Sequence, residues 1–171
     1  MKRAVTVLAL VFVATVASAY AFGWTLVTAT IRREFPDVPR ISTEQLAAWL
    51  HDSSRPAPLL LDVRTRAEYE VSHLADARHA EPDAAPSVID APKDRAIVTY
   101  CSVGYRSSVF ARKLRGAGFT NVQNLEGSIF KWANEGRPVY RAATEVADVH
   151  PYNHTWGLLL AKKHRARAGS R

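Results

Sequence analysis

The order of apolar and polar positions predicts strands that alternate with helices from about residue 40 onward. Strands are predicted at residues 59–63, 96–100 and 122–125, and the first two are apolar runs of the kind found in strands covered on both faces. Helices are predicted after Ser42, after Thr65, and over residues 107–115 and 128–134, where apolar residues recur at helical spacing. This alternation implies an α/β domain with a mainly parallel sheet and right-handed crossovers.

The starts of the first two helices carry a specific signal. Ser42 is followed three residues later by Gln45, and Thr65 is followed three residues later by Glu68. Each pair has the pattern of a capping box, in which the two side chains satisfy each other's backbone N–H groups. Residues 80–95, in contrast, are rich in Pro, Asp and Ala and predict a loop with one helical turn at most.

The N-terminal stretch, residues 1–33, predicts membrane targeting. It has no charged residue between Ala4 and Ile31, which is long enough to cross a bilayer as a helix. The basic start and the small residues ending at Ala19 also fit a cleavable signal peptide, whereas the apolar character past that site, including Trp24, fits a retained anchor. We therefore expect an extracytoplasmic domain that is membrane-anchored, or secreted or periplasmic after cleavage near Ala19.

The rest of the chain is predicted to have three parts. Residues 34–39 contain two prolines and predict a linker, residues 40–141 a folded domain, and residues 142–171 a basic C-terminal tail that is either solvated or docked on the domain or the membrane. The formal net charge of +7 is concentrated at the two ends, so we expect no nucleic-acid partner for the domain. The tail histidines lack helical spacing and acidic neighbours, and no metal site is expected.

Cys101 is the one cysteine in the chain and follows the predicted strand at residues 96–100. It cannot form an intramolecular disulfide, so its thiol is either a buried small apolar group or a reactive one. A reactive cysteine needs its thiolate stabilised. The N–H groups of residues 102–106, the helix start at Ser107 and the charge of Arg106 can provide this, and Gly104 allows the loop to turn tightly.

Several motifs together resemble the single-domain rhodaneses, a family of sulfurtransferases. They occur in family order over about residues 40 to 141: Leu60 to Arg64 with Glu68 and Tyr69, Ser72 to Leu74, Tyr100 to Ser107, Asn124 to Ser128 with Trp132, and Gly136 to Val139. The resemblance implies a three-layer α/β/α fold with a mainly parallel central sheet. It also implies a catalytic Cys101 that carries a persulfide and passes its sulfur to an external thiol or cyanide, without a cofactor.

The Cys101 loop favours one chemistry over a related one. Four residues separate Cys101 from Arg106, whereas cysteine phosphatases have five, in a longer loop that holds a tetrahedral oxyanion. The substrate-binding loop is expected to comprise Ser102, Val103, Gly104, Tyr105, Arg106 and Ser107. Ser102 and Val103 are neutral, whereas thiosulfate-using rhodaneses carry basic residues at these positions. A persulfide or polysulfide is therefore expected as the sulfur donor at least as much as thiosulfate. A non-enzymatic binding or sulfur-sensing module at the membrane is the alternative.

Two charged residues at the end of the first strand have a supporting role in this interpretation. Asp62 is expected to bond loop backbone or to pair with an arginine rather than to move protons. Arg64 is expected to be structural, with attraction of substrate as the alternative.

Overall fold

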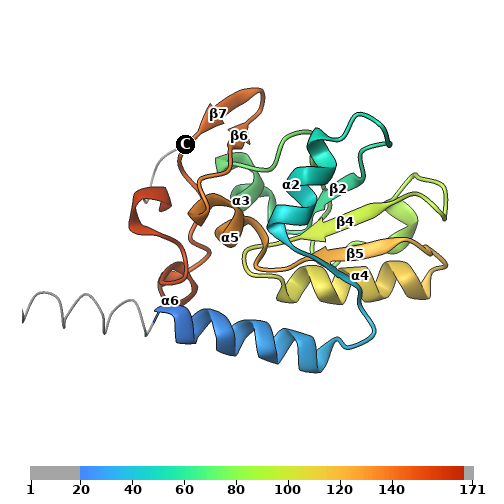
Figure 1. The fold of residues 1–171 in the computed structure, drawn as a ribbon, viewed down its shortest axis with the longest axis horizontal. Helices are drawn as coiled ribbons and strands as arrows, with labels where there is room; N and C mark the ends of the chain where they lie inside the picture. Colours follow the sequence, from blue (N-terminus) through green and yellow to red (C-terminus); the bar gives the residue numbers. More distant parts are fainter. Residues whose placement is uncertain (1–19, 168–171) are drawn as a thin grey trace, which may run out of the picture.

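A parallel five-stranded sheet lies at the centre of the computed structural model, which describes residues 20–167 (Figure 1). The strand order is β1-β5-β4-β2-β3, and all four pairings are parallel. The strands are β1 (Arg40–Ile41), β2 (Leu59–Asp62), β3 (Arg78–His79), β4 (Ile97–Tyr100) and β5 (Val122–Leu125). The three predicted strands are confirmed as β2, β4 and β5, and the two short edge strands are additional.

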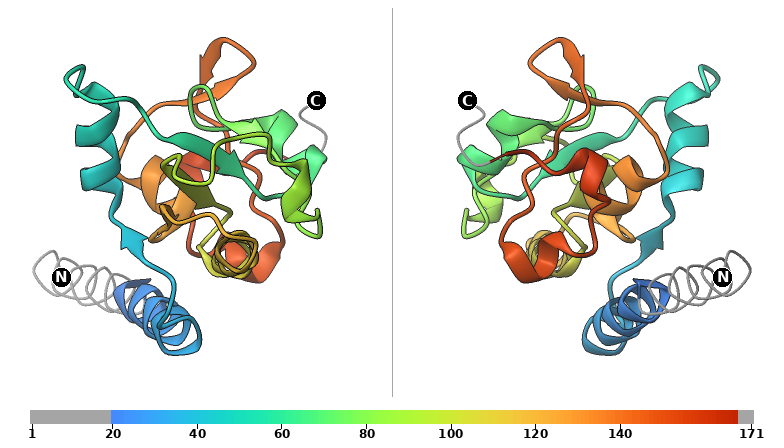
Figure 2. Two further views of the ribbon diagram at one scale, coloured as in Figure 1. Left: turned by 90° about the vertical axis from the view of Figure 1, so that its right-hand side faces the viewer. Right: turned by 90° about the vertical axis from the view of Figure 1, so that its left-hand side faces the viewer.

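Helices cover both faces of this sheet (Figures 1 and 2). On one face, α2 (Thr43–His51) and α5 (Ser128–Asn134) pack on alternate strand residues such as Leu60 and Val98. On the other, α4 (Tyr105–Gly116) packs on the intervening residues, such as Leu61. The predicted α/β/α layering is thereby confirmed.

Local sequence signals set the helix starts. Both predicted capping boxes form, at Ser42 before α2 and at Thr65 before α3 (Arg66–Val71). The prediction for α4 was wrong by two residues, since it starts at Tyr105 rather than Ser107. Gly104 is the N-cap of α4. Its φ is 112°, a backbone conformation that residues other than glycine rarely adopt.

Residues 20–34 form a helix that packs against the domain. Arg32 pairs with Glu126, and the Tyr20 hydroxyl donates to the carbonyl of Leu159 at 3.1 Å. The predicted linker at residues 34–39 also packs against the domain, because Phe35 and Val38 are buried. Among residues 20–167, no helix is long and apolar enough to cross a membrane. The predicted targeting segment falls largely on residues 1–19, which lie outside the described part.

The segment after α5 turns back across the carboxyl edge of the sheet (Figure 1). It comprises an antiparallel hairpin, β6 (Val139–Arg141) with β7 (Thr144–Val146), then α6 (His154–Gly157) and a short 3₁₀ turn, η2 (Lys162–His164). A second 3₁₀ turn, η1 (Pro86–Val88), lies in the predicted loop. Val149 and Leu160 are fully buried, and the N–H of Ala166 donates to the carbonyl of Val149, so the basic tail docks on the domain as far as Ala166.

Candidate active site

Cys101 lies directly after β4, at the carboxyl edge of the sheet, where ligands of parallel α/β sheets bind. Its side chain is buried, and the residue is 1% exposed. The backbone N–H of Gly104 donates to its sulfur at 3.2 Å. Gly104 is thus the member of the predicted ring of N–H groups that bonds the sulfur, and α4 begins at the next residue.

The start of α5 holds the first two residues of the loop. The N–H of Cys101 donates to the hydroxyl of Ser128 at 3.1 Å. The carbonyls of Cys101 and Ser102 accept from the N–H groups of Ile129 and Phe130 at 3.2 and 3.1 Å. Sequence analysis missed this clamp, although Ser128 stands within the Asn124 to Ser128 motif.

Asn124, in β5, holds the middle of the loop. Its amide donates to the carbonyl of Gly104 at 3.1 Å and to the hydroxyl of Ser108 at 2.9 Å. The same carbonyl accepts from the hydroxyl and the N–H of Ser108. All three residues are buried. Their hydrogen bonds fix the backbone of Gly104, whose N–H points at the sulfur.

Arg106 does not offer a free positive charge to the cavity, because Glu68 binds it. Both terminal guanidinium nitrogens donate to Glu68 carboxylate oxygens at 2.8 Å, and one also donates to the hydroxyl of Ser102 at 3.0 Å. Burial raises the pKa of Glu68, but the hydrogen bonds and charge of Arg106 outweigh it and bring this pKa to about 2. For Arg106, burial lowers the pKa, and Glu68 together with the charge of Cys101 raises it above its usual value.

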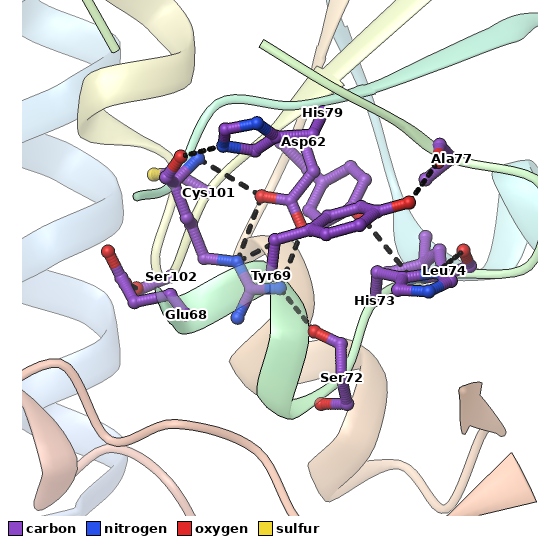
Figure 3. Close-up of polar contacts among 12 residues, drawn as sticks. Asp62, Glu68, Tyr69, Ser72, His73, Leu74, Ala77, His79, Cys101 and Ser102 are labelled. Atoms are coloured by element: carbon purple, nitrogen blue, oxygen red, sulfur yellow. Dashed lines mark hydrogen bonds and ion pairs between the residues drawn. The ribbon is translucent and has the colours of Figure 1, made fainter. Parts of the chain in front are cut away.

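Asp62, which lies near Cys101 in Figure 3, forms a fully buried ion pair with Arg64. The guanidinium contacts both carboxylate oxygens, at 2.6 to 3.2 Å, and also donates to the carbonyl of Ser72. One guanidinium nitrogen, Nη1, has no hydrogen-bond partner among the described residues. Asp62 therefore pairs with an arginine, one of the two contacts expected for it, and the arginine is Arg64.

A cavity of about 120 Å³ opens onto the loop. Five of the predicted site residues line it: Cys101, Ser102, Val103, Tyr105 and Arg106. Ser107 does not; it is buried in α4, and its carbonyl accepts from Thr99. The remaining wall is formed by Tyr152 and Trp156 of the C-terminal segment, which sequence reasoning missed because their positions relative to the loop depend on the path of the chain.

This fold and site define a class of proteins, those that hold a cysteine in a short loop at the carboxyl edge of a parallel α/β sheet. The model of the rhodanese-like domain matches residues 42–135, more than half of the chain. The chain therefore belongs to the rhodanese-like domain family, and Tyr152 and Trp156 lie beyond the matched region.

Curated proteins and solved structures resemble the same part of the chain. A protein of Allochromatium vinosum named sulfurtransferase is 36% identical over 103 residues, which span 60% of this chain and 94% of that protein. The probable adenylyltransferase/sulfurtransferase MoeZ of Mycobacterium tuberculosis is 32% identical, over 57% of this chain but only 25% of its own length. The Alr3790 protein of Anabaena has 27% identity and a TM-score of 0.55, over 58% of this chain and 79% of that chain.

Proposed function

We propose that the protein is a sulfurtransferase that carries sulfane sulfur as a persulfide on Cys101. The observation that carries the proposal is the position of the only thiol of the chain, in a rigid loop with a backbone N–H 3.2 Å from the sulfur and a small cavity in front of it. Relatives named sulfurtransferases support the same class of activity.

The first step loads the cysteine. The Cys101 thiolate attacks the terminal sulfur of a persulfide donor R–S–S⁻, the S–S bond of the donor breaks, and the products are Cys101–S–S⁻ and the thiolate R–S⁻. The new terminal sulfur occupies the cavity. The N–H of Gly104 and the start of α4 stabilise negative charge on the sulfur.

The second step needs an acceptor from outside the chain, because Cys101 is the only cysteine. An external thiolate attacks the terminal sulfur of the Cys101 persulfide, forms its own persulfide and releases the Cys101 thiolate. Cyanide reacts in the same way and leaves as thiocyanate. No net oxidation or reduction accompanies the complete cycle.

Mass spectrometry of the intact full-length chain tests the proposal. The protein is incubated separately with hydrodisulfide (HSS⁻), glutathione persulfide and thiosulfate, and then weighed. The expected result is the gain of one sulfur atom with at least one donor, its absence in Cys101→Ser, and its loss on addition of cyanide with formation of thiocyanate. No adduct with any of the three donors would overturn the proposal.

The alternative of a non-enzymatic module gives a different result in the same assay. A domain that only senses sulfur would load Cys101 once without turning over. Thiocyanate formed in large molar excess over protein excludes that alternative, whereas a single equivalent supports it.

We further propose that residues 1–33 carry the domain out of the cytoplasm, as a retained anchor or as a signal peptide cleaved near Ala19. After cleavage near Ala19, the helix at residues 20–34 would stay with the domain, because the Tyr20 hydroxyl bonds Leu159 and accepts from Asn134. N-terminal sequencing of the mature protein distinguishes the two forms. A second test fuses the C-terminus to a reporter enzyme that is active only in the cytoplasm. Activity of this reporter would overturn the proposed topology.

A further inference from the structure

The C-terminal segment makes an excursion over the Cys101 loop that is pinned at both ends. Val149 is buried at its start, and its N–H and carbonyl bond the backbone of His164 and Ala166 at 2.7 and 3.0 Å. At its end, Asn134 of α5 accepts from the N–H of Ala161 and donates to the carbonyl of Leu159. The residues between these points, 150–158, are therefore held in place over the edge of the sheet (Figure 1).

Two aromatic side chains of this excursion face the reacting cysteine. Tyr152 and Trp156 line the same cavity as Cys101, which measures about 120 Å³. The ring of Tyr152 lies over the guanidinium of Arg106, 4.6 Å from its centre, the geometry of a cation–π contact. Tyr152 has a φ of 63°, unusual for a residue other than glycine, and its N–H donates to the imidazole of His150 at 3.0 Å.

These contacts leave the cavity with little capacity for a second negative charge. Among the described residues that line it, Arg106 is the one with a cationic side chain. Glu68 neutralises its charge through two hydrogen bonds, and Tyr152 covers its face. The remaining side-chain wall is mostly apolar or aromatic, from Val103, Tyr105 and Trp156. Moving a dianion from water into such a site is costly because its second charge meets no unpaired cation among the described residues that line the cavity.

We propose that Tyr152 and Trp156 determine donor specificity: they restrict the sulfur donor of Cys101 to a small persulfide or polysulfide with a single negative charge, and they exclude dianionic and bulky donors. This inference rests on the proposed function and names the substrate class of the same site. For the smallest such donor, Cys101–S⁻ attacks HSS⁻, the S–S bond breaks, and Cys101–S–S⁻ and HS⁻ are formed.

The test compares loading rates of Cys101 from three donors in the full-length chain. Hydrodisulfide is small and singly charged, glutathione persulfide is bulky, and thiosulfate is a dianion. In the wild type, hydrodisulfide should load roughly tenfold or more faster than either of the others. Equal rates from all three donors in the wild type would overturn the inference without any variant, while still supporting persulfide formation on Cys101.

Variants of the two aromatic residues give the second arm. Tyr152→Ala and Trp156→Ala should raise the rate of loading from glutathione persulfide, relative to the rate from hydrodisulfide, by roughly tenfold. Tyr152→Phe keeps the ring over Arg106 and should behave as wild type. Leu158→Ala is the matched control, since Leu158 belongs to the same segment, is exposed and does not line the cavity.

The failure of this inference is distinguishable from that of the proposed function. Loading from no donor in any variant removes the proposed function itself. Loading with unchanged donor preference in both alanine variants removes only the role of Tyr152 and Trp156. Thermal unfolding of each variant is recorded beside the rates, and an alanine variant that is unfolded is replaced by Trp156→Leu, for which the same change in preference is expected.

Discussion

Arg106 and Glu68, 38 positions apart in the chain, form a two-pronged ion pair beside the candidate nucleophile. The carboxylate is almost completely buried, whereas the arginine side chain is 24% exposed at the cavity. The arginine that sequence analysis assigned to stabilising the sulfur anion is thus shared with a carboxylate. Several properties of the site can be tested through this pair.

The stability of the protein should depend on the ionisation of Glu68. Its pKa is about 2 in the folded protein, below the ordinary value of 4.5, so its contribution to the free energy of unfolding is fully present above pH 4.5 and is lost as the pH falls towards 2. We expect a loss of up to about 3 kcal/mol over this range. Urea unfolding at several pH values measures it. Glu68→Gln should remove this component, and Glu70→Gln, at an exposed neighbouring position, should retain it.

Removal of the arginine should destabilise the fold, because Glu68 is then left buried without its ion-pair partner. For Arg106→Met, which keeps the length of the side chain without its charge, we expect a loss of about 2 to 3 kcal/mol at pH 7. Chemical unfolding of the single variants and of Arg106→Met combined with Glu68→Gln measures the coupling. A double variant no more stable than Arg106→Met would contradict the assignment of the loss to the unpaired carboxylate.

The two members of the pair should change thiol reactivity in opposite directions. The charge of Arg106 interacts favourably with the Cys101 anion, and Glu68 partly cancels it. Alkylation of Cys101 by iodoacetamide at neutral pH should be slower in Arg106→Met and faster in Glu68→Gln, each by roughly fivefold, equivalent to about 1 kcal/mol. Equal rates in all three proteins would mean that Arg106 only braces the loop.

Gly104 should not tolerate a side chain. Its φ of 112° is strained for any other residue, and an added Cβ would approach the Asn124 amide at 3.4 Å. Gly104→Ala should lower the free energy of unfolding by about 1 to 3 kcal/mol and displace the N–H that bonds the sulfur. Gly116→Ala is the control, because a Cβ there meets nothing within 4 Å, and in a helix it should be neutral or stabilising. Equal effects at both positions would refute the role of the backbone conformation.

Removal of the Ser128 hydroxyl should destabilise the fold. It accepts the N–H of Cys101 and donates to the carbonyl of Leu125, both at 3.1 Å, in a fully buried position. Ser128→Ala leaves a buried donor unsatisfied and should cost about 1 to 3 kcal/mol. Ser87→Ala, at an exposed position in η1, should have no measurable effect in the same thermal unfolding assay. A loss below about 0.5 kcal/mol in Ser128→Ala would show that the clamp contributes little.

The sequence by itself determined the elements whose signals are local. The apolar run at β2, the capping boxes before α2 and α3 and the helix α5 all depend on residues within a few positions of one another, so their pattern is readable without the fold. The position of Cys101 at the carboxyl end of a parallel strand followed from the same pattern. Two-residue strands such as β1 and β3 carry too little periodicity to be predicted.

Only the tertiary structure decided what surrounds Cys101. The pairing of Arg106 with Glu68 and the clamp by Ser128 join segments that are distant in sequence, and no local pattern encodes them. The docking of the tail depends on burial of Val149 and Leu160, which places Tyr152 and Trp156 at the cavity. Residue types and spacing thus identified the candidate nucleophile, whereas the charge balance and size of its cavity follow from contacts that form only when the chain folds back on itself.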